Sequence, residues 1–316
     1  MDLRSTPLPS RHVEGDRPVA TAAVIAFTEG PAVAADGTLY FSDIIGNRIL
    51  RLRPSDRRPT VWRSPSGRAN GLLFDARGKL LVCEGNEFGE HDGNRRVTRI
   101  DVETGALQVL TDRFEGRRYN APNDVAACSD GTIFFTDPCY SARETMELDH
   151  ESVYRIGVDG SVVRAVTQPE IQRPNGIAIS PDENTLYVVD SCPDAGGNRK
   201  IWAFDLSRDR MPRNQRLVFD FAPGRGGDGM AVDRDGNLYI AAGVLQPRSK
   251  HETTDVPAGI WVLSAAGELQ GRIPVPEDVL TNVTFGGEDL RTLYITAGKN
   301  VFRTRVRVPG FVVHRR

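Results

Sequence analysis

The chain contains 316 residues, with 40 basic and 42 acidic side chains and a formal net charge of −2 at pH 7. A chain with no excess of positive charge lacks the field that nucleic-acid binders use, so we exclude nucleic-acid binding as its main role. Its hydrophobic content of 39% is ordinary for a globular protein and excludes wholesale disorder.

The N-terminal end is rich in Pro, Ser and Arg, and we assign residues 1–18 to an N-terminal extension and 19–316 to a single domain. The chain contains no signal-peptide-like apolar run and no stretch of about 18 apolar residues, so we expect no membrane segment. Its four cysteines form no CxxC pair, and we expect reduced thiols. These features predict a cytoplasmic protein.

One type of segment recurs six times along the rest of the chain. Each copy is a short apolar run, a turn, and a second run rich in Leu, Tyr, Phe, Ile and Val. Turns such as Asp36-Gly37 and Asp130-Gly131 predict tight hairpins, because glycine accepts a positive φ. The copies begin at Glu29, Asn70, Asn123, Asn175, Asp228 and Asn282.

A second hairpin follows several copies, so each unit offers four short antiparallel strands. Six such units predict an all-β fold, a six-bladed β-propeller with four-stranded antiparallel blades. The even spacing of the units argues against a β-sandwich or two smaller all-β domains. The segment Ala20–Phe27 is the candidate for the strand that completes the last blade and closes the ring.

Three long loops follow the second strands of their units, at residues 85–96, 141–152 and 244–258. We therefore expect all three at one mouth of the propeller, the mouth where each first strand begins. Loops held over one face of a rigid scaffold commonly carry function.

Polar residues begin all six repeats, and in a propeller such positions converge on the central channel. Carboxylate and amide oxygens in that number suit a hard cation such as Ca²⁺. No Cys or His occupies any of the six positions, which argues against a structural zinc site. For any single one of these residues, the alternative is that it only stabilises a turn by bonding to its own backbone.

Four acids end the second strands of the first four units: Asp43, Glu84, Asp137 and Asp190. One interpretation is that they orient the amides or a metal-bound water. The other is that they form ordinary hydrogen bonds to neighbouring blade turns.

The motifs EGP at Glu29, PND at Asn123, RPNGIAIS around Asn175 and GDGMAVD at Asp228 make the chain resemble a known family. It is the senescence-marker-protein/gluconolactonase/luciferin-regenerating family, and the bacterial gluconolactonases are the most similar branch. The resemblance implies a six-bladed propeller, one axial divalent cation and lactonase activity. The implied cation ligands are Glu29, Asn175 and Asp228, with Asn123 as a further ligand or substrate contact.

Two departures from the family pattern concern the substrate. Animal members carry an arginine two residues before the asparagine that corresponds to Asn123, and this chain has Ala121 there. The segment GNEFGE is inserted before His91, which is a candidate proton shuttle or a solvated surface residue.

The sequence thus predicts a divalent-metal-dependent lactonase that hydrolyses a gluconolactone-like sugar lactone to the hydroxy acid. The cation, Ca²⁺ with Mg²⁺, Mn²⁺ or Zn²⁺ as alternatives, would polarise the carbonyl, and Asp228 would activate water. We assign substrate binding to Asn123, Asn70, Asn282 and His91. Three alternatives stay open: a phosphotriesterase, a non-sugar lactonase, and a non-catalytic ligand-binding propeller. The expected partner is a small-molecule lactone, and the oligomeric state is left open.

Overall fold

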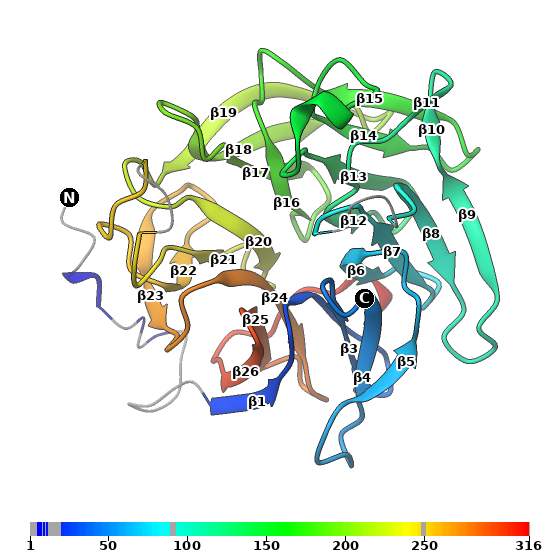
Figure 1. Ribbon diagram of the computed structural model, residues 1–316. Helices are drawn as coiled ribbons and strands as arrows, with labels where there is room; N and C mark the ends of the chain where they lie inside the picture. The colour runs from blue at the N-terminus through cyan, green and yellow to red at the C-terminus, as the bar shows by residue number, and fades with distance from the viewer. Residues whose placement is uncertain are drawn as a thin grey trace.

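A computed structural model describes residues 5–7, 9, 11, 20–88, 93–247 and 251–315. His91 and most of the segment 1–18 therefore lie outside the described residues. The described chain forms six four-stranded antiparallel sheets arranged in a ring, which confirms the predicted six-bladed β-propeller (Figure 1). This part of the chain contains no α-helix, and it contains no helical segment that is long and apolar enough to cross a membrane.

The first three blades follow the chain in order from the innermost strand outward. Blade 1 comprises β2 (Thr28–Val33), β3 (Leu39–Asp43), β4 (Arg48–Leu52) and β5 (Thr60–Arg63). Blade 2 comprises β6 (Ala69–Phe74), β7 (Leu80–Glu84), β8 (Arg96–Ile100) and β9 (Leu107–Thr111). Blade 3 comprises β12 (Val125–Ala127), β13 (Ile133–Asp137), β14 (Ser152–Ile156) and β15 (Val162–Val166). The short hairpin β10 (Arg113–Phe114) and β11 (Arg117–Arg118) separates blades 2 and 3.

The last three blades repeat this order. Blade 4 comprises β16 (Pro174–Ile179), β17 (Thr185–Ser191), β18 (Arg199–Leu206) and β19 (Pro212–Asp220). Blade 5 comprises β20 (Gly227–Val232), β21 (Leu238–Ala242), β22 (Gly259–Leu263) and β23 (Leu269–Pro274). Blade 6 comprises β24 (Leu280–Gly286), β25 (Thr292–Ala297), β26 (Asn300–Arg305) and β1 (Ala20–Val24). Within residues 20–88, 93–247 and 251–315, two short 3₁₀ turns occur, η2 (Arg143–Thr145) and η3 (Val313–Arg315).

The ring closes through the strand from the N-terminal side of the chain. β1 pairs antiparallel with β26, and Ala20 faces Arg303 in the register. This pairing confirms the closing strand predicted within Ala20–Phe27. Each inner strand contacts the inner strands of both neighbouring blades, so β2, β6, β12, β16, β20 and β24 surround the central channel.

The hydrophobic core lies between adjacent blades. All five residues of β21 are buried, because neighbouring blades cover both faces of this strand. Tyr239 and Ala241 pack toward blade 6, whereas Leu238 and Ile240 pack toward blade 4. Period-2 alternation therefore assigns successive side chains to two different interfaces, which explains the continuous apolar runs in the sequence.

Candidate active site

The inner strands begin with an irregularity that turns one polar side chain toward the channel. In blade 4, Pro174 pairs with Asp190 and the register then shifts before Ile177 pairs with Val188. Blades 2 and 5 show the same shift after the first pair, and in blade 1 the shift follows the pair of Glu29 with Ser42. The residues at the shift are Glu29, Asn70, Asn175 and Asp228, followed in each case by glycine.

Those glycines are required by the close approach of neighbouring inner strands. A Cβ on Gly176 would lie 2.2 Å from the carbonyl oxygen of Asp228, and one on Gly30 would lie 2.1 Å from the carbonyl oxygen of Asn70. A side-chain Cβ does not approach a carbonyl oxygen that closely in folded proteins, so only glycine fits at these positions. The strand starts of adjacent blades are therefore packed backbone to backbone. This packing holds the polar side chains in a fixed ring.

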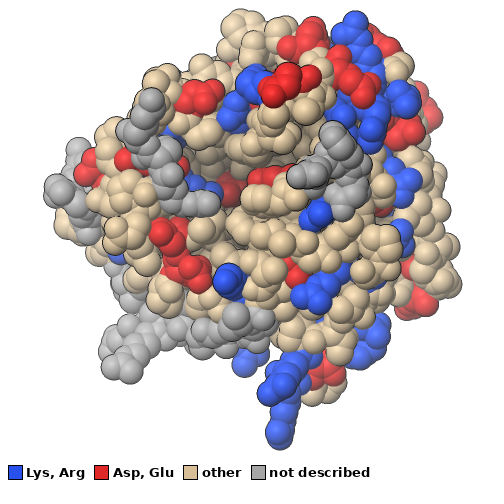
Figure 2. Space-filling view, in the orientation of Figure 1, with Lys and Arg blue, Asp and Glu red and all other residues tan. Residues whose placement is uncertain are grey.

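One cavity of about 250 Å³ lies where these strands begin, at one end of the channel. Four of the predicted site residues line it together, each less than a tenth exposed: Glu29, Asn123, Asn175 and Asp228. Figure 2 shows this face hollowed near its centre, with acidic side chains visible inside the hollow. Two of the three long loops reach the cavity, through Glu87 and Glu252, as their position after the second strands predicted. The loop 141–152 contributes no lining residue, although Tyr140, directly before it, lines the cavity.

Asn70 lies beside the cavity rather than on its wall. Its Nδ2 donates to Glu87 Oε2 at 3.2 Å, and Glu87 lines the cavity. Its Oδ1 is buried and has no hydrogen-bond partner in the described part of the chain. A buried acceptor without a donor is costly in a folded protein, so this oxygen is suited to a cation or a substrate hydroxyl.

Asn282 does not occupy the place that the sequence assigned to it. In blade 6, Leu280 makes the first pair with Ala297, so Thr281 corresponds to Asp228 and Asn282 to the glycine that follows it. The Thr281 hydroxyl donates to the carbonyl of Thr28 at 2.8 Å. The expectation that Asn282 occupies the sixth position of the polar ring is therefore wrong, because Thr281, one residue earlier, lies at that position.

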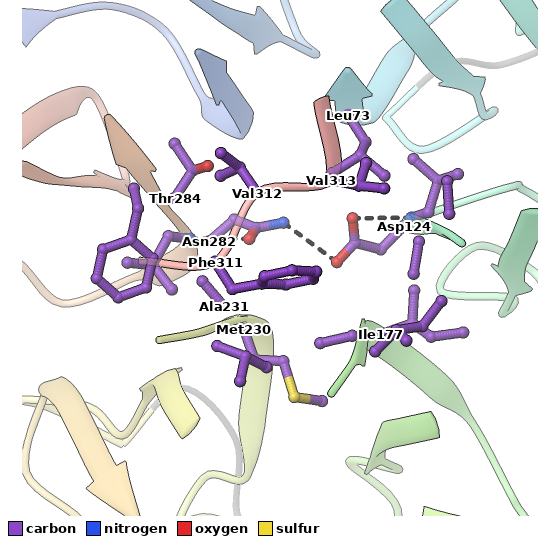
Figure 3. Close-up of a pocket in the computed structure, with 18 of the residues that line it drawn as sticks. Leu73, Asp124, Ile177, Met230, Ala231, Asn282, Thr284, Phe311, Val312 and Val313 are labelled. Atoms are coloured by element: carbon purple, nitrogen blue, oxygen red, sulfur yellow. Dashed lines mark hydrogen bonds between the residues drawn. The ribbon is translucent and has the colours of Figure 1, made fainter. Parts of the chain in front are cut away.

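Asn282 instead reaches across the axis below that ring. Its Nδ2 donates to Asp124 Oδ2 at 3.4 Å, which joins blade 6 to the opposite blade 3 (Figure 3). Both residues line a separate, mainly apolar cavity of about 90 Å³, which Phe311, Val312 and Val313 from the C-terminal segment also line. Burial raises the pKa of Asp124 to about 7.

The buried acids around the channel repel one another. Burial, followed by the charges of Asp228 and Asp124, raises the pKa of Glu29 well above its ordinary value. Burial also raises the pKa of Tyr140, and the charges of Asp228 and Glu87 add to the effect. A bound cation would offset this repulsion.

Two arginines add positive charge to the cavity wall. Arg225 Nη2 donates to Asp228 Oδ2 at 2.8 Å, and Arg225 Nη1 donates to the carbonyl of Leu280 at 3.0 Å. Arg199 is the second arginine of the lining. Sequence reasoning missed Arg199, Arg225 and Tyr140, because their distances from the repeat starts differ between blades.

The donor set fits a hard cation. Two carboxylates and several amides offer only oxygen atoms, which is the ligand chemistry of Ca²⁺. No group of three or more His, Cys, Asp or Glu side chains is arranged to hold a metal within the described ranges, so amide oxygens would have to complete the coordination. The unpartnered Oδ1 of Asn70 and the crowding around Glu29 are the observations that support the fit.

Three of the four acids that end the second strands accept hydrogen bonds from the backbone of their own blades, and Asp43 accepts from the Phe27 N–H at 3.1 Å. Glu84 accepts from side chains instead. Asp137 accepts from the N–H groups of Asn120 and Ala121, both at 2.8 Å. Asp190 accepts from Gln172 and Arg173 in the corresponding segment of blade 4. These three carboxylates therefore hold the segments that lead into the inner strands of blades 1, 3 and 4. The four cysteines are buried and free.

Comparison with known proteins places this geometry in a family. Residues 27–299 match the family model described as "SMP-30/Gluconolactonase/LRE-like region". A gluconolactonase of Zymomonas mobilis is 31% identical over 90% of this chain and 80% of its own length. The diisopropyl-fluorophosphatase of Loligo vulgaris is 27% identical over 86% of each chain.

A solved structure supports the same assignment. The gluconolactonase XC5397 of Xanthomonas campestris superposes with a TM-score of 0.78 at 32% identity, covering 96% of this chain and 93% of its own. The family model spans most of the chain, from the end of β1 to the start of β26. The chain therefore belongs to the SMP-30/gluconolactonase/LRE-like family.

Proposed function

We propose that this protein is a divalent-cation-dependent lactonase that opens a sugar lactone of the gluconolactone kind to its hydroxy acid. The observation that carries the proposal is that Glu29, Asn123, Asn175 and Asp228, from four different blades, line one cavity on the propeller axis. The gluconolactonases of Zymomonas mobilis and Xanthomonas campestris add support from the family.

The four residues would hold the cation through oxygen atoms. Ca²⁺ suits the donors best, with Mg²⁺, Mn²⁺ and Zn²⁺ as alternatives. When bound, such a cation polarises a carbonyl oxygen and stabilises the charge that develops on it.

The protein's own side chains orient the substrate and move the proton. Asp228 accepts a proton from the attacking water, whose oxygen bonds to the lactone carbonyl carbon. The ring C–O bond then breaks, and the leaving alkoxide takes up the proton that Asp228 received from the water. Arg225 holds the Asp228 carboxylate through its 2.8 Å contact. Asn123, on the cavity wall, and the Asn70–Glu87 pair would contact substrate oxygens.

The test is hydrolysis of D-glucono-1,5-lactone in a pH-stat, corrected for the spontaneous rate. Protein stripped by a chelator should be inactive, and one of the four cations should restore turnover. Asp228→Asn should lower the restored rate at least about 100-fold, as expected for loss of a general base. The matched control is Asp220→Asn, because Asp220 is exposed at the end of β19. Cation-independent turnover, or full activity in Asp228→Asn, would overturn the proposal.

A second candidate is phosphotriester hydrolysis on the same site. It is favoured by the diisopropyl-fluorophosphatase relative and by an aromatic pair at the cavity, where the Phe27 and Phe88 rings lie 4.9 Å apart. Hydrolysis of diisopropyl fluorophosphate without lactone turnover would select this reaction. A bound cation with neither activity would indicate a ligand-binding propeller.

A further inference from the structure

Arg199 is a buried arginine whose guanidinium has almost no protein partner. It begins β18 in blade 4, is 5% exposed, and lines the axial cavity. Its Nη1 donates to the carbonyl of Asn198 at 3.2 Å. Within residues 20–88, 93–247 and 251–315, the guanidinium makes no further hydrogen bond and no ion pair.

The other buried arginines of the described chain are paired with carboxylates. Arg173 is also 5% exposed, and its Nε lies 2.9 Å from Glu151 Oε1. Arg95 is 7% exposed, and its Nη1 lies 3.7 Å from Glu147 Oε1. Arg199 differs from both, because the charge it carries into the interior meets a cavity instead of an acid.

Burial of a guanidinium is unfavourable unless an anion accompanies it. Desolvation lowers the pKa of Arg199, and the charges of Glu252 and Asp194 offset this only in part. Arginine does not lose its proton in proteins, so the charge remains. Glu252 lines the same cavity but makes no ion pair with Arg199.

Arg225 shows that the two cavity arginines have different tasks. Its guanidinium is committed to Asp228 and to the Leu280 carbonyl, so it supports the residue that we assign to catalysis. The planar fork of Arg199 offers Nε and Nη2 together, which is the geometry that binds a carboxylate through two parallel hydrogen bonds.

We propose that Arg199 determines substrate specificity by binding an acidic substituent of the lactone, so that the preferred substrates are lactones of sugar acids that keep a second carboxylate. This inference rests on the proposed lactonase function and names its substrate class. The chain has Ala121, not arginine, two residues before Asn123. In this chain Arg199, on blade 4, supplies positive charge to the cavity instead.

The first test compares two lactones of one ring size. D-Glucaro-1,4-lactone carries a carboxylate where D-glucono-1,4-lactone carries a hydroxymethyl group. We expect the wild-type protein to prefer the acidic lactone in kcat/KM by about 10-fold or more, the range of a charge-assisted hydrogen bond. Arg199→Gln should reduce this ratio at least about 10-fold, and Arg199→Lys, which keeps the charge without the fork, should fall between the two.

The control variant is Arg272→Gln on β23, outside the cavity lining, where Arg272 Nη1 donates to the Ala258 carbonyl at 2.7 Å. It should leave the ratio unchanged. A ratio in Arg199→Gln equal to that of the wild-type protein, or a wild-type preference for the neutral lactone, would overturn the assignment.

A binding measurement separates this inference from the proposed function. Calorimetric titration with D-glucarate and with D-gluconate, in the presence of Mg²⁺, should show about 10-fold tighter binding of glucarate, and Arg199→Gln should abolish the difference. Glucarate binding that depends on Arg199, without turnover of either lactone, would support the acidic subsite and overturn the lactonase. Turnover of both lactones with no preference in rate or binding would support the lactonase and overturn the acidic subsite. Neither binding preference nor turnover would overturn both.

Discussion

The side-chain amide of Asn175 donates to the hydroxyl of Tyr140, with 2.8 Å between Nδ2 and Oη. This bond fixes the amide orientation and directs Oδ1 away from the tyrosine. The Tyr140 ring in turn lies 5.5 Å from the Arg173 guanidinium, which is paired with Glu151 at 2.9 Å. A chain of contacts thus runs from a buried ion pair to a proposed cation ligand.

Removal of the tyrosine hydroxyl should weaken cation binding. In Tyr140→Phe the Asn175 amide loses the partner that sets its orientation, and we expect about 10- to 100-fold weaker cation affinity, the usual effect of losing a group that orients a ligand. Calorimetric titration of substrate-free protein with Ca²⁺ measures this directly. Tyr187→Phe, in the core between blades 4 and 5, is the matched control. Equal affinities in all three proteins would contradict the positioning role.

Loss of Glu151 should destabilise the fold. Its side chain is 1% exposed and pairs with the buried Arg173. Glu151→Gln therefore leaves the buried guanidinium with only the 3.6 Å contact to the exposed Asp194 as an ion pair. We expect the free energy of unfolding to fall by about 3 kcal/mol in urea denaturation. Asp205→Asn breaks the exposed pair with Arg216 and should cost less than about 1 kcal/mol. Similar losses in the two variants would show that Arg173 finds another partner.

The sequence predicted the ring because every blade repeats a similar hairpin, with a glycine at the turn in four of the six copies. The positions of Glu29, Asn123, Asn175 and Asp228 followed from that repeat, since identical strand starts converge in a propeller. The assignment failed at Asn282, where residue type favoured the asparagine but the strand register places Thr281 at the equivalent position. A shift of one residue at a bulge is decided by backbone pairing, which the sequence alone does not display.

The cavity wall was less predictable than its centre. Arg199 begins a third strand, Arg225 precedes an inner strand, and Tyr140 follows a second strand. These residues share no spacing, so no repeat could indicate that they meet. Their roles follow from partners distant in sequence, as Tyr140 and Asn175 illustrate.

The stability of the protein should fall as the pH rises through the range in which Asp137 titrates. Burial raises the pKa of Asp137 from 3.8 to about 7, so the folded state retains a proton that the unfolded chain releases near pH 4. Between about pH 4 and pH 7 the unfolded state binds fewer protons, and the free energy of unfolding decreases with pH, by up to about 4 kcal/mol from this group.

Urea denaturation at pH 5, 6 and 7 measures the slope for the wild-type protein and for Asp137→Asn. The variant does not titrate at this position, so it should show a flatter dependence on pH, although it is less stable at pH 5 because its amide group cannot accept both backbone N–H groups. Equal slopes of the free energy of unfolding against pH in the two proteins would mean that Asp137 is ionised throughout this range.

The effect of Glu29→Gln on the melting temperature should have opposite signs without and with a bound cation, because Glu29 lies among other buried acids. Glu29 is buried and repelled by Asp228 and Asp124, whereas glutamine can still accept the 2.6 Å hydrogen bond from the Gly30 N–H. In a chelator, the variant should therefore melt at the same temperature as the wild-type protein or above it.

With Ca²⁺ at about 100 times its dissociation constant, the wild-type protein should gain about 2.7 kcal/mol, or about 5 °C in Tm. Glu29→Gln should gain much less, because it lacks one of the two proposed carboxylate ligands, and should then melt below the wild-type protein. Glu103→Gln, at an exposed turn, should follow the wild-type protein in both conditions. Glu29→Gln melting below the wild-type protein by the same margin with chelator and with Ca²⁺ would mean that Glu29 stabilises the fold through its own contacts, and Ca²⁺ would then lose its most buried proposed ligand.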